Sequence, residues 1–445
     1  MTKLLVIMIA CIGSISIAAQ AAGKPHILII LADDLGWNDV GYHGSPIQTP
    51  NIDRIASEGI ELDRFYVQPT CSPTRAGLMT GKLPQRFGIY RPLNKTTERS
   101  VPLEEQFLPE YLADQGYQSF MVGKWHLGHT SGLLPSARGF DRTIAMADTG
   151  ADNWEQRTYL PIYDKANWYA DGAEHTLPDD FYSSKFLVDK TIEFIDSGKD
   201  DGKPFFAYVP FTQTHEPVDA HPDFKGKTGN GSFADVLAQT DSYVGELLST
   251  VEKLGLKDNT IFIFTSDNGR EGIKRSFGFT GPWRGAMFSP YEGSLRVPFL
   301  IRYPDHIPAQ QVSNDPVHLV DLFPTLAKFA GGKIPQDRTL DGLDQSKFFM
   351  AKTPKSPRES VIIYIGNELF GVKWRNWKML LKEIDEDSYA IQTMAYPSIY
   401  NLLVDPKEEE PEKFYLDDTW VDYPLWEVIE AHELSIEKDA GAPGP

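Results

Sequence analysis

The sequence predicts an α/β fold in which a large, mostly parallel sheet is sandwiched between helices. Short apolar runs rich in β-branched and aromatic residues are typical of strands buried on both faces. Four such runs occur, at 27–31, 117–122, 205–211 and 260–265. Amphipathic helical patterns separate them, at 51–58, 108–115, 183–196 and 233–253. Strands that alternate with helices favour a parallel sheet covered on both faces.

A smaller unit is expected after a boundary near residues 330–358, where glycine, proline and lysine are frequent. Four shorter strand-like segments follow, at 360–365, 369–374, 377–382 and 398–403, and a helix is expected near 426–434. They predict a small C-terminal α+β subdomain with an antiparallel sheet. We therefore divide the chain into a signal peptide (1–22), a main domain (23–345) and a C-terminal subdomain (346–445) with a frayed end at 441–445.

The N-terminus resembles an export signal. Lys3 precedes an apolar run at 4–17, and Ala19-Gln20-Ala21 provides small residues for cleavage. A membrane anchor is the alternative, but glycine and serine interrupt the run, which is short for a membrane span. We expect an exported bacterial protein, periplasmic or secreted, that is not integral to a membrane.

Charge and cysteine content narrow the function. The formal net charge of −19 opposes binding to nucleic acid, so no nucleic-acid partner is expected. An anionic substrate would need a locally positive pocket. Of the two cysteines, Cys11 lies in the signal, so the mature chain keeps Cys71 alone. It cannot form an internal disulfide and is either an inert buried residue or one kept for its chemistry.

Polar clusters follow the predicted strands, where parallel α/β sheets bind their ligands. Asp33-Asp34 follows the first strand and Asp267-Asn268 follows the fourth. Their oxygens suit a hard cation such as calcium or magnesium better than zinc. A turn or a helix cap is the ordinary alternative for either pair alone.

The segment around Cys71 favours an anion. Pro73 suits the first turn of a helix, which would place Cys71 at the helix N-terminus, and Arg75 adds a cation. Cys71-x-Pro73-x-Arg75, followed by Leu-Met-Thr-Gly, closely resembles the signature of the formylglycine-dependent sulfatases of the alkaline phosphatase-like superfamily. The resemblance covers residues from about 24 to about 410 and includes further motifs in order: Asp33-Asp34-Leu35-Gly36, Thr49-Pro50-Asn51-Ile52-Asp53, Gly123-Lys124-Trp125-His126-Leu127-Gly128, His215-Glu216-Pro217, Ser266-Asp267-Asn268-Gly269, Tyr291-Glu292-Gly293, Tyr400-Asn401-Leu402 and Asp405-Pro406.

This resemblance implies a sulfuric ester hydrolase and makes the main domain the catalytic one. A maturation enzyme would convert Cys71 to formylglycine, whose hydrate attacks sulfur with one hydroxyl and expels sulfate with the help of the other. One calcium ion per chain would neutralise charge on the sulfate. Its implied ligands are Asp33, Asp34, Asp267, Asn268 and residue 71.

The resemblance also assigns roles to charged and proton-transferring side chains. Arg75 and Lys124 would stabilise the formylglycine and the sulfate. His126 resembles the base that drives release of sulfate, and His215 resembles the donor to the leaving oxygen. Each has a structural alternative, such as a solvated lysine or a hydrogen-bonded core histidine.

One segment departs from the family pattern. Met287 stands about where many members have a lysine between an Arg-Gly pair and Glu-Gly. Arg284 either replaces that cation or forms a structural ion pair, and arginine is no simple substitute for lysine.

The substrate is expected to be a sulfated carbohydrate. The segment 148–154 with Arg157 and His175 lies where the family builds its substrate pocket, and Trp154 would suit a sugar ring. Loop packing is the alternative for each residue. Two other functions stay open: a phosphodiester or phosphonate monoester hydrolase of the same superfamily, and a non-catalytic protein that binds sulfated glycans.

Overall fold

The computed structural model describes residues 23–93, 99–150, 153, 168–178, 181–198, 201–272, 278–386, 388–412 and 419–439. The predicted signal peptide at 1–22 and the predicted frayed end at 441–445 lie outside these residues, as do Trp154 and Arg157.

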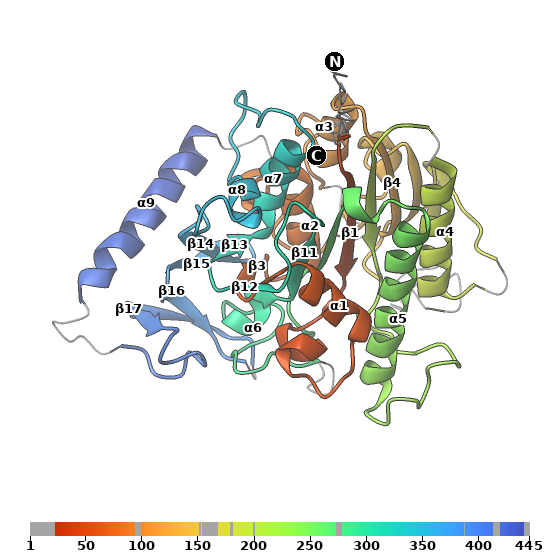
Figure 1. Ribbon diagram of the computed structural model, residues 1–445. Helices are drawn as coiled ribbons and strands as arrows, with labels where there is room; N and C mark the ends of the chain where they lie inside the picture. Colours follow the sequence, from red (N-terminus) through yellow and green to blue (C-terminus); the bar gives the residue numbers. More distant parts are fainter. Residues whose placement is uncertain are drawn as a thin grey trace, which may run out of the picture.

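A ten-stranded sheet forms the centre of the molecule (Figure 1), in the order β12-β2-β11-β9-β1-β8-β4-β5-β6-β7. Its parallel core contains the four predicted strands and one more: β9 (Thr260–Ser266), β1 (His26–Ala32), β8 (Phe205–Pro210), β4 (Gln118–Lys124) and β5 (Arg142–Met146). Shorter strands complete both edges: β11 (Phe299–Arg302), β2 (Ile60–Leu62), β12 (Gln311–Ser313), β6 (Trp168–Ala170) and β7 (Ala173–Glu174). The predicted large, mostly parallel sheet is confirmed.

Helices cover both faces of this sheet, as the sequence predicts. Successive residues of β1 point to opposite faces, so Ile27, Ile29 and Leu31 belong to one apolar core while Leu28 and Ile30 belong to the other. The first core includes side chains of α2 (Cys71–Thr80), α3 (Leu108–Asp114), α7 (Leu322–Phe329) and α8 (Ser346–Phe349). The second includes α1 (Pro50–Glu58), α4 (Ser183–Gly198) and α5 (Ser232–Lys253).

The parallel register determines where the strands end. Ala32 of β1 lies opposite Ser266 of β9, and Leu31 lies opposite Pro210 of β8. The loops that follow these strands therefore leave the sheet at one common edge, where the sequence predicts the site.

A four-stranded antiparallel sheet forms the C-terminal part, in the order β14-β15-β16-β17. Its elements are β14 (Ser360–Ile365), β15 (Glu368–Trp374), β16 (Trp377–Ile384), β17 (Ile391–Asn401) and α9 (Asp422–Lys438), which packs against β15 and β16. This confirms the predicted small sheet and terminal helix. However, β17 begins at Ile391, seven residues before the predicted start. No strand was predicted there because residues 391–396, which are all exposed, show no alternation of apolar and polar residues.

An apolar core joins the C-terminal sheet to the main body of the molecule. Tyr66 and Tyr291 of the main body pack with Val361, Phe370 and other residues of the C-terminal sheet. A small third sheet joins this region, with β3 (Phe65–Tyr66) between β10 (Arg296–Val297) and β13 (Val317–His318), and the short helix α6 (Glu292–Leu295) precedes β10. We keep the boundary between residues 345 and 346 as a proposal.

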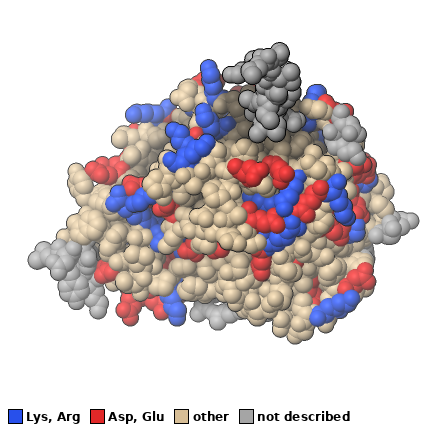
Figure 2. Space-filling model, viewed as in Figure 1, with Lys and Arg blue, Asp and Glu red and all other residues tan. Residues whose placement is uncertain are grey.

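Acidic and basic side chains are interspersed on the face shown in Figure 2. Within the described ranges, no helix has both the length and the apolar composition that crossing a membrane requires.

Candidate active site

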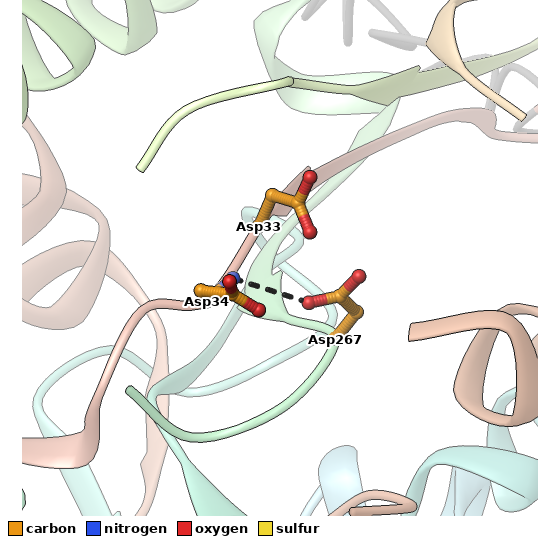
Figure 3. A group of neighbouring side chains, drawn as sticks. All are labelled: Asp33, Asp34 and Asp267. Atoms are coloured by element: carbon orange, nitrogen blue, oxygen red, sulfur yellow. Dashed lines mark hydrogen bonds between the residues drawn. The ribbon is translucent and has the colours of Figure 1, made fainter. Parts of the chain in front are cut away.

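Three carboxylates meet at the carboxyl edge of the parallel sheet. Asp33 and Asp34 directly follow β1, Asp267 directly follows β9, and the three side chains point toward one another (Figure 3). One carboxylate oxygen of each lies within 4.8 Å of those of the other two. The Asp34 N–H donates to Asp267 Oδ1 over 3.3 Å. The two acidic clusters that the sequence predicted to converge therefore form one group.

The backbone conformation and its hydrogen bonds hold Asp33 and Asp34 in place. Asp34 adopts a left-handed conformation, with φ of 59°, which aspartate tolerates better than most residues. The Asp33 N–H donates to the Gln213 carbonyl over 2.9 Å, and the Thr214 N–H donates to the Asp33 carbonyl over 2.7 Å. The loop after β8 thus fixes the turn that follows β1.

Asn268 completes an oxygen-rich cluster. Its Nδ2 donates to Asp34 Oδ1 over 2.6 Å and to the Gly269 carbonyl over 2.9 Å. Its Oδ1 and the Asp34 Oδ2 are buried and accept no hydrogen bond from the described residues. Buried polar atoms ordinarily have a partner, and calcium takes carboxylate and amide oxygens as ligands. The residues therefore fit a bound calcium ion.

Charge repulsion and burial are evident in this cluster. Burial raises the pKa of Asp267 to about 6, and the negative charge of Asp33 adds to the effect. Burial also raises the pKa of Asp34, although the positive charge of His215 opposes the shift. A cation bound between these carboxylates would reverse both shifts.

Cys71 is the first residue of α2, and its side chain is buried beside this cluster. As predicted, it lies at a helix N-terminus, where backbone N–H groups favour negative charge. Burial raises the pKa of the thiol to about 12, and the positive charge of Lys124 offsets this only in part. The unmodified thiol is therefore protonated near neutral pH and is a weak nucleophile.

Arg75 and Lys124 bring two buried cations to the carboxylates. Lys124 ends β4, and its Nζ donates to both oxygens of Asp33, over 2.6 and 2.9 Å. Arg75 donates to Asp267 and also to the Lys124 carbonyl, from Nη1 over 2.6 Å. Burial lowers the pKa of Lys124, but Asp33 and the other anionic groups around it together outweigh this effect and raise the pKa. Both residues are ionised and lie where the sequence placed them.

His126 is buried and neutral. Burial lowers its pKa well below the usual value, and the positive charges of Lys124 and Arg75 add to this. Its Nε2 lies 2.6 Å from the Leu93 carbonyl, so Nε2 carries the proton. Its Nδ1 then presents a lone pair, and within the described part of the chain that atom has no hydrogen-bond partner. This tautomer is suited to accept a proton.

His215 lies beside Asp34 of the acidic group. Its Nε2 is 3.9 Å from Asp34 Oδ2, and its Nδ1 is 2.7 Å from the Glu216 carbonyl. The predicted residues Cys71, Arg75, Lys124, His126, His215 and the four proposed metal ligands are therefore brought together.

Arg284 makes contacts of a different kind. Its Nε donates to Glu386 over 3.1 Å, its Nη1 donates to the Glu408 carbonyl over 2.8 Å, and the guanidinium lies 3.8 Å from the centre of the Tyr291 ring. These contacts match the structural ion pair that the sequence left open as the alternative to a sulfate-binding role. Met287 is buried, and its N–H donates to the Arg270 carbonyl over 3.0 Å.

Supporting residues were not assigned a role from the sequence. The Ser72 hydroxyl donates to the His126 carbonyl over 2.8 Å and accepts from the Leu93 N–H over 3.0 Å. Ser72 thus joins α2, which carries Cys71, to the loop after β4, which carries His126. A serine directly after the cysteine was a signal of proximity to the site, but not of these partners. His175, which was proposed to line the substrate pocket, follows β7, and its N–H donates to the Trp168 carbonyl over 2.8 Å.

Comparison with known proteins agrees with this geometry. The model of the Sulfatase family matches residues 25–332, and that of the N-sulphoglucosamine sulphohydrolase C-terminal family matches residues 287–412. N-acetylgalactosamine-6-sulfatase of Mus musculus is 32% identical over 453 residues, covering 93% of this chain and 86% of the relative. Arylsulfatase A of Bos taurus is 34% identical, covering 92% and 87%.

A solved structure shows the same architecture at full length. The crystal structure of PsFucS1 sulfatase from Pseudoalteromonas sp. superposes with a TM-score of 0.85 at 28% identity, covering 94% of this chain and 91% of that one. The shared fold and the matched sequence extend through both sheets. The chain therefore belongs to the sulfatase family, the sulfuric ester hydrolases.

Proposed function

We propose that this sulfatase removes sulfate from a sulfated carbohydrate, with formylglycine at position 71 as nucleophile and one bound calcium ion. The observation that carries the proposal is the placement of Cys71 at the N-terminus of α2 beside three converging carboxylates and two buried cations. This arrangement places two cations, and carboxylates that would hold a metal ion, beside one position from which an oxygen nucleophile could attack.

The unmodified thiol is poorly suited to this task. Its raised pKa keeps it protonated, so little thiolate is present near neutral pH. Conversion of Cys71 to formylglycine would supply a hydrated aldehyde whose oxygens attack sulfur without a thiolate. The conversion requires a maturation enzyme as partner, and such an enzyme would act before the buried position closes.

The metal ligands follow from the cluster geometry. Asp33, Asp34, Asp267 and Asn268 would hold calcium together with residue 71, and the ion would neutralise charge on the sulfate oxygens. Asp267 would also accept the proton of the nucleophile. Arg75 and Lys124 would orient the sulfate and stabilise the charge that develops on its oxygens, because both cations are fixed by hydrogen bonds before substrate arrives.

Proton transfer is assigned to the two histidines. His126 would act as the base that accompanies release of sulfate, because its Nδ1 carries the lone pair and its Nε2 proton is fixed by Leu93. His215 would donate a proton to the leaving alcohol oxygen of the substrate. These two proton transfers are the ordinary steps of general acid–base catalysis.

The names of similar proteins support a carbohydrate substrate. The relative from Mus musculus is named N-acetylgalactosamine-6-sulfatase, and a structure of Ps i-CgsB, with a TM-score of 0.82 at 26% identity, holds k-i-k-neocarrahexaose. From the export signal predicted at 1–22, we further propose that the enzyme is exported and meets its substrate outside the bacterial cytoplasm.

Hydrolysis rates on a matched panel test this proposal. Protein produced with a maturation enzyme should hydrolyse 4-nitrophenyl sulfate and at least one sulfated sugar among N-acetylgalactosamine 6-sulfate, N-acetylglucosamine 6-sulfate and carrageenan oligosaccharides. It should hydrolyse 4-nitrophenyl phosphate far more slowly. Faster hydrolysis of the phosphate would favour the phosphodiesterase or phosphonate hydrolase alternative. Binding of sulfated sugars without any turnover by the converted protein would favour the non-catalytic one.

A further inference from the structure

Phe288 lies beside the nucleophile loop. Its N–H donates to the Pro69 carbonyl over 3.0 Å, and Pro69 is two residues before Cys71. Two residues of chain span at most about 7 Å, so the Phe288 backbone lies within about 10 Å of the nucleophile position. The Phe288 side chain is not part of the core, since 36% of it is exposed.

A second exposed aromatic residue, Tyr389, approaches the same region from the C-terminal sheet. Tyr389 lies in the turn between β16 and β17, with 48% of the residue exposed. A Cβ placed on Gly272 would be 2.7 Å from the Tyr389 hydroxyl and 3.8 Å from the Met287 carbonyl oxygen. Gly272 is four residues after the proposed metal ligand Asn268. The Tyr389 hydroxyl thus lies against Gly272, in the loop after β9 that carries Asp267 and Asn268, and close to Met287, the residue before Phe288.

The same turn is held in place by further contacts. The Arg284 Nε donates to Glu386 in this turn over 3.1 Å, and the Tyr291 hydroxyl donates to the carbonyl of Ile384 over 3.0 Å. The two donors, Arg284 and Tyr291, flank Met287 and Phe288 in the sequence. The ion pair of Arg284 therefore positions the turn that carries Tyr389 beside the active site.

Both aromatic residues have a backbone conformation that favours glycine. Phe288 has a φ of 69° and Tyr389 a φ of 56°. A bulky residue in this left-handed region is strained, and glycine would relieve the strain. Strain of this kind clusters at functional sites. Phe288 and Tyr389 thus keep aromatic rings at positions where glycine would fit the backbone better.

We propose that Phe288 and Tyr389 form an aromatic wall that binds the pyranose ring of the substrate beside the sulfate site. This inference rests on the proposed function and specifies how the sugar is held. Aromatic faces suit the apolar C–H face of a sugar, whereas the hydroxyl of Tyr389 can bind a sugar hydroxyl.

Glycine variants separate this role from folding. Phe288→Gly and Tyr389→Gly remove the rings and relieve the backbone, so thermal unfolding should show unchanged or higher midpoints. For the sulfated monosaccharide that wild type hydrolyses fastest, each variant should raise KM by about tenfold or more. The inhibition constant of inorganic sulfate, which needs only the sulfate site, should change less than about twofold. Tyr423→Ala, which removes an exposed ring of α9, is the matched control and should leave all these values unchanged.

The outcomes are distinguishable. A KM within about twofold of wild type in both glycine variants would overturn the wall. An equal loss of affinity for inorganic sulfate would also overturn it, because it would indicate general distortion of the site. A converted enzyme that hydrolyses 4-nitrophenyl sulfate but no sulfated sugar would overturn the wall and leave the sulfatase intact. A converted enzyme without any sulfatase turnover would overturn the proposed function itself.

Discussion

Arg75 donates two hydrogen bonds to the same carboxylate oxygen of Asp267, from Nε over 3.0 Å and from Nη2 over 2.7 Å. Both side chains are fully buried. The pair joins α2, which carries the nucleophile position, to the loop after β9, which carries two proposed metal ligands. Charge-assisted bonds of this kind also fix orientation, so the pair holds the nucleophile helix in a fixed position relative to the proposed metal ligand Asp267.

Replacing Arg75 by lysine should therefore reduce catalysis although charge is kept. Arg75→Lys loses the fork that contacts Asp267 and the Lys124 carbonyl together. We expect kcat/KM for 4-nitrophenyl sulfate to fall by about 100-fold, which corresponds to about 2.7 kcal/mol. Arg375→Lys, at an exposed arginine paired with Glu359, is the matched control and should not change the rate. A rate for Arg75→Lys equal to that of the control would remove the pair from catalysis.

His126→Gln tests the proposed base. Glutamine can still donate to the Leu93 carbonyl but offers no basic nitrogen, so kcat should fall by about 100-fold with little change in KM. Circular dichroism and thermal unfolding should show a folded protein. His432→Gln, at another buried histidine, which contacts Tyr364 on the C-terminal sheet, should retain wild-type kcat. Full activity of His126→Gln would assign this histidine a purely structural role.

Calcium binding should stabilise the folded protein. Because Arg75 and Lys124 neutralise only part of the charge of the three clustered carboxylates, calcium added to chelator-treated protein should raise the midpoint of thermal unfolding. Asp34→Asn should lose most of this increase. Asp241→Asn is a useful control, since Asp241 caps the N-terminus of α1 and its loss should lower the midpoint without abolishing the response. An undiminished calcium response in Asp34→Asn would exclude Asp34 as a ligand.

Lys373 should make stability depend on pH at a distance from the active site. Burial lowers the pKa of this lysine from 10.5 to about 7, although its Nζ lies 3.9 Å from Glu292 Oε2. Between these values the unfolded chain holds a proton that the folded chain has lost, so the free energy of unfolding should rise with pH. Below about pH 7 the charged form is buried at a cost on the order of 5 kcal/mol.

Lys373→Met should therefore raise the free energy of unfolding more at about pH 6 than at about pH 10, as measured by urea denaturation. In the variant, Glu292 still accepts hydrogen bonds from Lys378 and Tyr66, so its buried carboxylate keeps hydrogen-bond partners. Lys382→Met, at a partly exposed lysine on the same strand as Lys378, should show no such difference. A gain that is larger at high pH would contradict the lowered pKa.

The centre of the fold was predictable because strands buried on both faces leave an unmistakable apolar run. The run at 27–31 became β1, and all four predicted parallel strands agree with the structure within two residues at each end. The edge strands were not predictable. For example, Gln311–Ser313 is a strand of three residues, partly exposed, with no periodicity that could distinguish it from a loop.

The sequence predicted which residues would come together at the candidate site, but not all of their contacts. Motifs placed at strand ends identify Asp33 and Asp267 because parallel strands end at one edge. The partners that fix them are backbone groups or distant side chains. The Leu93 carbonyl that determines the His126 tautomer carries no sequence signal, and Glu386, the partner of Arg284, lies on a turn of the other sheet.

The most direct test of the account is mass spectrometry of the peptide that contains residue 71, from active enzyme, combined with the rate of 4-nitrophenyl sulfate hydrolysis. We predict that the peptide carries an aldehyde in place of the thiol, and that the rate rises in proportion to the aldehyde fraction as co-production of a maturation enzyme is increased. Cys71→Ala should have neither. Full activity in a preparation whose residue 71 is an unmodified cysteine would contradict the account.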